Sequence, residues 1–393
     1  MPPRLSTQDH VLFDESIESL RPQEPITDPL EIGPSTSFLL TDFLISEPWE
    51  FRDFRINPSI RKELPCGNAA YISEINNPHW VGISNANLFG IGIAAVITFV
   101  TGRACKSTRD SHLCNRPVSP DAAIELAMMH PIRYAGSGAI SPLISSTKLA
   151  EHRSSVARLF EKLHSIPHSE YVIIMQSIRL CHLSLLSKRD DYGLAYFLAV
   201  AAIEAIAQTA IPNAEFDKSK EKEWKEHFKN DEIGKELLAA YRALRNEAQK
   251  TGKTKSRFIK FISTYAPPST WRSITQSNMF TETPVAPSED LRTEETLTEA
   301  ALLDLISQTY NLRSRFAHAG AQPPNSSPNS PGIPLETKRE YQFIEVEHRI
   351  GDEAFTHEVP VLSETVLPTH ELLIGIARHA ISEWVYSLTN ETA

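Results

Sequence analysis

The hydrophobic pattern of the chain changes near residue 150. Before that point, short apolar and β-branched runs alternate with turn residues, as at 37–45, 69–75 and 91–100, which is typical of strands. After it, apolar residues recur every three to four positions, which is typical of amphipathic helices. We therefore expect an α+β protein, in which a β-rich N-terminal domain (residues 36–150) precedes a helical domain (residues 151–393).

The helical domain is predicted to be a bundle with a β-hairpin inserted between its helices. An Ala-rich apolar segment at 192–210 is suited to the centre of the bundle, and another helix begins near 297 and ends at Gly320, because glycine commonly follows a helix end. Residues 341–361 alternate apolar and polar residues about Gly351-Asp352, which predicts the hairpin. Other helices are expected at 217–229, 231–250, 253–264 and 370–388.

Three segments lack a sustained period. Residues 1–35 are polar and Pro-rich and are predicted to be a loose lead-in. The Pro-containing segment at about 267–296 and the segment at 321–336, rich in Pro, Ser and Asn, are predicted to be mobile loops.

Charge and cysteine content narrow the class of protein. The net charge of −10 argues against a protein that coats nucleic acid through bulk positive charge, although a local basic site is compatible with it. Four scattered cysteines fit a reducing compartment. The longest apolar stretch, 88–100, is shorter than the roughly 20 residues needed to cross a bilayer, and the N-terminus has no apolar secretory segment. We expect a cytoplasmic protein that does not enter a membrane.

Two motifs could suggest a cofactor or a metal, but each is incomplete. The segment Gly90–Ala95 matches the G-x-G-x-x-A dinucleotide pattern, which requires a helix to start at the glycines, whereas the following β-branched residues favour a strand. Cys105, His112 and Cys114 lack a Cys-x-x-Cys pair and an obvious fourth ligand. We therefore expect neither a cofactor nor a metal.

The remaining candidate chemistry lies in Arg313-Ser-Arg-Phe-Ala-His318. RNA carries its own nucleophile in the 2′-hydroxyl, so cleavage needs a proton carrier and a positive charge at the phosphorane. His318 is suited to be the general acid or base, and the guanidinium of Arg313 can bind two phosphate oxygens. Ser314 could orient the arginine or the phosphate. Arg315 could bind RNA, or cap the helix end as surface arginines commonly do.

Glu204 is a second residue of interest, because it lies within an apolar helix. If buried it needs a partner, and Arg313 is a reasonable one. A plain surface position for Glu204 is the alternative.

A similar spacing of arginine and histidine occurs at Arg4 with His10 and at Arg158 with His164. The first pair lies in an aperiodic segment, and the second is predicted to lie within a helix that has no ending signal near His164. The third pair is Arg313 with His318, and Ala319-Gly320 is predicted to end its helix close to His318. A regular helix places positions five apart about 140° from each other, so we expect fraying at this end to let both side chains face one phosphate.

From about 170 to 390 the sequence resembles the Apea-like HEPN family. The resemblance rests on the helix Leu194–Gln208 with its Ala-Ile-Glu204 element, on the basic segment around Lys255 and Arg257, and on Tyr310–Gly320. The family pattern near the last segment ends in His-Gly-Gly, and here Ala319 stands at the first glycine.

The resemblance implies a helical bundle that dimerises and cleaves RNA without a metal, often as a toxin or in bacterial defence against phage. It adds Lys255 and Arg257 as candidate RNA contacts, and we expect Leu312 and Phe316 to lie at the homodimer contact. An HEPN-like module that binds RNA or a protein without cutting is the main alternative, and a helix end that carries Arg and His by chance is another. The N-terminal domain could bind a regulatory partner or do the main work itself.

Overall fold

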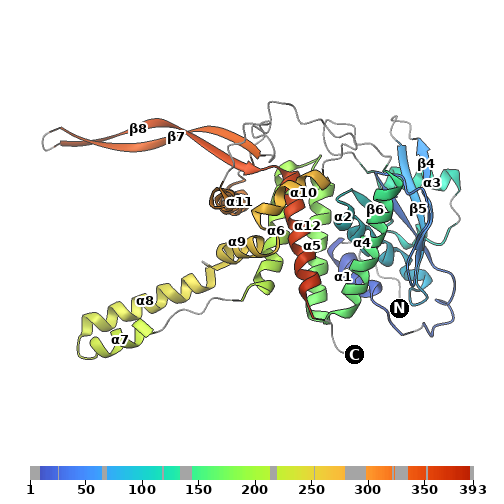
Figure 1. Ribbon diagram of the computed structural model, residues 1–393, viewed down its shortest axis with the longest axis horizontal. Coiled ribbons are helices and arrows are strands. Elements are labelled where there is room, and N and C mark those ends of the chain that lie inside the picture. Colours follow the sequence, from blue (N-terminus) through green and yellow to red (C-terminus); the bar gives the residue numbers. More distant parts are fainter. Residues whose placement is uncertain are drawn as a thin grey trace.

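The computed structural model describes residues 9–24, 26–63, 69–116, 119–132, 144–212, 219–251, 253–278, 298–320, 323, 335–350 and 353–389. Within them, a small antiparallel sheet lies in the N-terminal part and a mainly helical region follows (Figure 1). The mixed α and β composition expected from the sequence is confirmed.

The N-terminal sheet has the strand order β2-β3-β5-β1-β6, with β4 paired to β5. Both faces of β1 are buried, because Leu39 packs in the main core while Phe38 and Leu40 pack in a smaller cluster with the helix α3. This explains the nearly continuous apolar run at this strand. The strands are β1 (Thr36–Thr41), β2 (Trp49–Glu50), β3 (Arg55–Ile56), β4 (Ile60–Glu63), β5 (Ala69–Asn76) and β6 (Cys105–Ser107), and α3 spans Pro120–Met129.

The third predicted strand of this region, 91–100, is wrong, because these residues form most of the helix α2 (Ala86–Thr101). Almost every side chain of α2 is buried, and a helix that is apolar all round is stable where the core surrounds it, whatever its β-propensity. The two glycines of the dinucleotide-like pattern lie inside α2 and not at its N-terminus. A Cβ on Gly92 would lie 2.7 Å from Cδ1 of Leu20, so this glycine serves close packing.

Residues 1–35 are not uniformly loose, because α1 spans Asp9–Leu20. Its residues Phe13, Ile17 and Leu20 follow helical spacing and are buried against α2. The hydroxyl of Tyr171 donates a hydrogen bond of 2.6 Å to the carbonyl of Ile17. The apolar face of α1 has only three residues between polar ones, so the sequence pattern did not reveal this helix.

The helical region is built around α6, which contacts α5, α9, α11 and α12, as Figure 1 shows for the centre of the molecule. The main apolar core continues from α1, the sheet and α2 into these helices. The helices are α4 (Ser146–Ser165), α5 (His168–Ser187), α6 (Tyr192–Ala210), α9 (Lys253–Tyr265), α11 (Glu299–Ala319) and α12 (His370–Ser387).

The expected loop at 267–296 is partly wrong. Residues 268–270 form a 3-10 turn and Trp271–Asn278 form α10, where the buried Trp271 donates through Nε1 to the carbonyl of Ala266 at 2.9 Å. Residues 279–297 lie outside the described residues, as do 321–334 except Pro323, while 335 and 336 begin β7.

Two slender elements extend from the same side of the body (Figure 1). One is the predicted hairpin, confirmed as β7 (Leu335–Ile350) paired with β8 (Glu353–Pro368) and longer than expected. The other is the helix pair α7 (Ser219–His227) and α8 (Glu232–Thr251). The predicted helices at 217–229 and 231–250 are thereby confirmed.

Two segments of the described chain have the length and composition of membrane-spanning helices, namely Ile83–Thr101 and Tyr192–Ala210. Both also belong to the protein core, since 72% and 56% of their residues are buried inside the protein. A cytoplasmic location stays a prediction.

Candidate functional site

The candidate site centres on an ion pair between α6 and α11. Nη2 of Arg313 lies 2.9 Å from Oε2 of Glu204, and Glu204 is only 8% exposed. The hydroxyl of Tyr310 donates to Oε1 of Glu204 at 3.2 Å. Burial and the nearby Glu204 carboxylate raise the pKa of Tyr310, which keeps this donor protonated. The predicted partnership of Glu204 with Arg313 is confirmed, and a surface position for Glu204 is excluded.

The Arg313 side chain is fixed from two directions. Besides the ion pair, its guanidinium carbon lies 5.6 Å from the centre of the Phe197 ring, and Phe316 packs on the same ring at 5.4 Å. The side chain remains 30% exposed, while its Nε is buried without a hydrogen-bond partner among the described residues. The site therefore holds a guanidinium in one orientation with part of it open to solvent.

His318 lies in the last turn of α11 and is exposed. The helix remains regular to Ala319 and is closed by Gly320, whose left-handed backbone (φ 64°) lets its N–H donate to the carbonyls of Arg315 and Phe316. The expected fraying is wrong. Because α11 is intact, Arg313 and His318 leave it about 140° apart and about 7.5 Å apart along its axis.

Ala319 at the family's first glycine position does not disturb this ending. Ala319 is the last residue of α11, and the positive φ falls on Gly320. The one glycine that the helix end requires is therefore present.

The other predicted site residues lie either on α11 or on the neighbouring helix α9. Ser314 is half-buried and Arg315 is exposed, so Arg315 is the more accessible of these two residues of the motif. Nζ of Lys255 donates to Oδ1 of Asn311 at 2.9 Å, which places this cation against α11. Arg257 instead donates through Nε to the carbonyl of Ile211 at 2.7 Å and through Nη2 to the carbonyl of Gln208.

Arg257 therefore closes the C-terminal end of α6, where backbone carbonyls lack helical partners. Its sequence context, a basic cluster, did not reveal this packing role. The structure brings Arg313, Glu204 and Tyr310 together, and it places Lys255 and Arg315 at the same helix but not in contact with the pair.

The competing pair of Arg158 and His164 is committed to other contacts. The guanidinium of Arg158 lies 4.3 Å from the Tyr386 ring centre. His164 bonds through Nε2 to the carbonyl of Leu20 at 2.9 Å, and burial lowers its pKa. The expectation that the helix continues past His164 is wrong, because α4 ends at Ser165, just before Pro167. Arg4 lies outside the described residues.

The candidate zinc residues do not form a ligand cluster. Among the residues that the structure describes, no group of three or more His, Cys, Asp or Glu side chains is placed to hold a metal. Cys105 and Cys114 are buried free thiols, and burial raises the pKa of Cys114 to about 11. Its Sγ lies 3.2 Å from Oγ1 of Thr108, so it packs as a small buried side chain.

Comparisons of the chain with models of known families, with curated proteins and with solved structures gave no match. The likeness to the Apea-like HEPN family therefore rests on the residues named above and stays a prediction.

Proposed function

We propose that this chain is a metal-independent endoribonuclease of the HEPN type, in which His318 carries the proton and Arg313 stabilises the phosphorane. The observation that carries the proposal is the ion pair in which the buried Glu204 of α6 holds Arg313 in place. Arg313 lies on α11, the helix that also bears the exposed His318. Following the family resemblance, we also propose that the protein acts in the cytoplasm as a toxin or an antiphage effector.

The proposed reaction uses the 2′-hydroxyl of the RNA. Its oxygen attacks the adjacent phosphorus and loses its proton, while the bond from phosphorus to the 5′-oxygen breaks and that oxygen gains a proton. The products are a 2′,3′-cyclic phosphate and a 5′-hydroxyl. Imidazole can accept the first proton or donate the second, and a guanidinium stabilises the charge that accumulates on the phosphoryl oxygens.

The Glu204 pair supports the role of Arg313 through preorganisation. A flexible arginine loses side-chain entropy when it binds a phosphate, whereas a guanidinium already fixed by a carboxylate and an aromatic ring loses less. The pair uses Nη2, and the side chain is still 30% exposed. A phosphate can therefore approach the exposed part of the fork.

We further propose that the active species is a homodimer. One intact α11 presents Arg313 and His318 on different sides, so a single chain offers an incomplete grip on a phosphate. A second copy placed along this helix end would double the cations and proton carriers in one groove. We expected Leu312 to lie at the homodimer contact, but this prediction is wrong, because the side chain is buried in the core of its own chain. Phe316 and Arg315, which are half-buried and exposed, are the candidates that remain.

The alternative function is an RNA-binding or protein-interaction module without catalysis. The ion pair of Arg313 with Glu204 is also compatible with this alternative, since the arginine can serve only to neutralise the buried carboxylate. RNA cleavage by the wild type, together with loss of that cleavage in a variant of the exposed His318, distinguishes the endoribonuclease from the module without catalysis.

The test compares RNA cleavage by the full-length wild type and its variants in the presence of EDTA. His318→Ala should lower the rate at least about 100-fold, because it removes the proton carrier, and it alters no described hydrogen bond. Arg313→Lys keeps the charge opposite Glu204 but loses the fork, and should lower the rate by about 100-fold or more.

The matched controls are His168→Ala and Arg61→Lys, which change an exposed histidine and the arginine of an exposed Arg–Glu pair. Both should cleave within about twofold of the wild type, as expected for surface changes. RNA binding without cleavage by the wild type would support the alternative, and equal losses in the controls would contradict the assignment of the site.

A further inference from the structure

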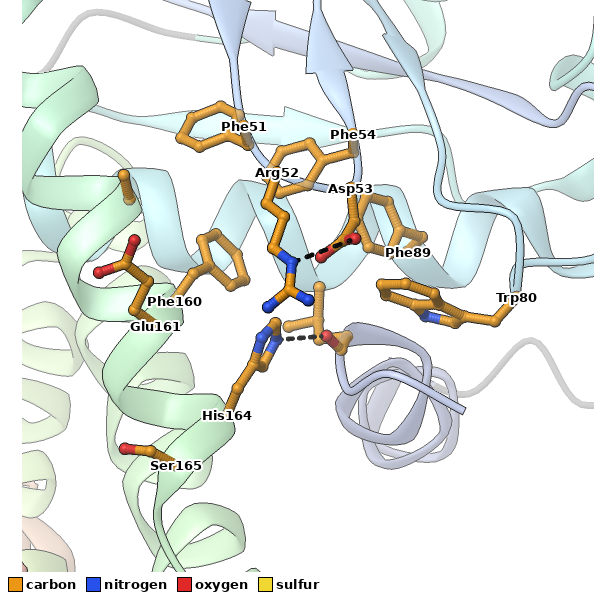
Figure 2. A pocket seen from close by; sticks show the side chains of 12 residues that line it. Phe51, Arg52, Asp53, Phe54, Trp80, Phe89, Phe160, Glu161, His164 and Ser165 are labelled. Atoms are coloured by element: carbon orange, nitrogen blue, oxygen red, sulfur yellow. Dashed lines mark hydrogen bonds and ion pairs between the residues drawn. The ribbon is translucent and has the colours of Figure 1, made fainter. Parts of the chain in front are cut away.

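A pocket lies away from Arg313 and His318, where α1, the β2–β3 turn and α4 meet. This pocket is partly open and has a volume of about 340 Å³, within the range of about 300–1,000 Å³ usual for small-molecule sites, and Figure 2 shows the side chains that line it. Its lining comes from five separate segments, which are Leu20, the turn at 51–54, Trp80, Phe89 and the part of α4 at 157–165.

Aromatic rings make up much of the pocket wall. Phe54 meets Phe89 at 5.3 Å with the ring planes 75° apart, and meets Phe160 at 5.5 Å with the planes 73° apart. Phe51 stacks behind Phe54 at 4.3 Å. Trp80 is held by a hydrogen bond of 3.1 Å from its Nε1 to the carbonyl of Ser19. Because Phe54 stands at steep angles to Phe89 and Phe160, this part of the wall suits a rounded group better than a flat one.

Two carboxylates are among the polar groups that line the pocket. Asp53, whose side chain is 27% exposed, lies beside the rings in Figure 2, and Glu161 lines the pocket on α4. Leu20, the last residue of α1, also borders the pocket, and its carbonyl already accepts a hydrogen bond from His164. An aromatic wall beside a carboxylate favours a positive charge.

The positive groups near the pocket are not placed to hold an anion. Arg52 crosses the front of the pocket between Asp53 and His164 (Figure 2), but its side chain is 93% exposed and its Nε is 3.9 Å from Asp53. His164 uses Nε2 on the Leu20 carbonyl, and burial lowers its pKa, which keeps it neutral at pH 7. Arg21 donates to the carbonyl of Ile166 at 3.3 Å and lies over the Tyr171 ring.

We propose that this pocket binds a small organic cation, an ammonium group with apolar substituents, with its charge against the aromatic faces and Asp53. The exposed Arg52 moves aside, and the ligand cation takes its place beside the carboxylate. This is a ligand site separate from Arg313 and His318, and it holds whether or not the chain cleaves RNA.

The test uses three probes of similar shape that differ in charge: choline, its uncharged isostere 3,3-dimethylbutan-1-ol, and the anion trimethylacetate. Calorimetric titration of the full-length protein should show that choline binds at least about tenfold more tightly than either of the others, because the cation–π and carboxylate interactions act on choline alone. Equal binding of the alcohol, tighter binding of the anion, or no choline binding at tens of millimolar would overturn the proposal.

Variants locate the binding in the pocket. Asp53→Asn removes a charge without changing shape and should weaken choline about fivefold to tenfold. Phe160→Leu should weaken it comparably by removing a ring. The control Glu151→Gln removes an exposed carboxylate of the same helix α4 that pairs with Lys148, and should leave binding unchanged. Thermal melting checks that each variant is folded, and an equal effect of Glu151→Gln would show nonspecific attraction.

Discussion

At the scale of single residues, the Glu204–Arg313 pair has both a structural and a proposed catalytic role. A buried carboxylate is tolerated only with a partner, because an unpaired charge in a low-dielectric interior is costly. Glu204 has two, the guanidinium of Arg313 and the hydroxyl of Tyr310. Removing Arg313 therefore changes more than the chemistry of the site, which is why Arg313→Lys is the better catalytic test.

We predict that Arg313→Ala lowers the free energy of unfolding by about 3 kcal/mol, since it leaves the buried Glu204 carboxylate with the Tyr310 hydroxyl but without a positive charge beside it. The double change Glu204→Gln with Arg313→Gln should recover part of that loss by removing both charges. Arg61→Ala breaks an exposed pair with Glu63 and should cost less than about 1 kcal/mol. Urea unfolding measures all three, and an Arg313→Ala protein as stable as Arg61→Ala would contradict the structural role.

At the scale of elements, the sequence predicted helices with a sustained apolar pattern, such as α6, α11 and α12, and Gly320 predicted the end of α11. The helices α6, α11 and α12 each begin at a side-chain cap, provided by Asp191, Thr298 and Thr369, and α11 ends at Gly320. Such local signals need no knowledge of the rest of the fold. The Glu204–Arg313 pair was also predictable from local sequence, because a single carboxylate in an apolar helix is stable when buried only if a cation lies beside it.

The elements that were missed depend on tertiary contacts. The residues of α2 favour strands locally, and only burial on all sides makes them a helix. The short α1 is stabilised by its packing on α2. The capping role of Arg257 and the intact end of α11 likewise depend on partners distant in sequence or on backbone geometry, which spacing alone does not reveal.

The packing of α1 on α2 leads to a prediction for Gly92. Gly92→Ala should lower the free energy of unfolding by about 1–2 kcal/mol, because the new Cβ would lie 2.7 Å from Cδ1 and 2.8 Å from Cγ of Leu20. In a Leu20→Ala background the same change should be neutral or stabilising, since alanine is the better helix former. A double-mutant cycle from chemical unfolding measures this coupling, and additive effects would contradict the close approach.

At the scale of the whole molecule, the two halves share one apolar core, while the proposed catalytic motif and the aromatic pocket lie on different elements. The net charge of −10 means that RNA must be held by a local group of cations. Arg313, Arg315 and Lys255 lie on or against α11, and a second copy at this helix would double them.

The homodimer proposal predicts a composite site. Light scattering should give twice the monomer mass, and mixing wild type with excess Arg313→Lys protein should lower the activity per wild-type chain to well below half, because most wild-type chains would then have a defective partner. Mixing with excess Arg61→Lys protein should leave it unchanged. A monomer that is fully active at nanomolar concentration would contradict the proposal.

The ends of the RNA fragments formed in EDTA show whether Arg313 and His318 cleave RNA without a metal. The wild type should leave 2′,3′-cyclic phosphates and 5′-hydroxyls at an undiminished rate, and His318→Ala should leave the RNA intact. Loss of cleavage on chelation, or fragments with 5′-phosphates, would contradict metal-independent cleavage, because the motif supplies a proton carrier and a cation but no means of activating water on a metal.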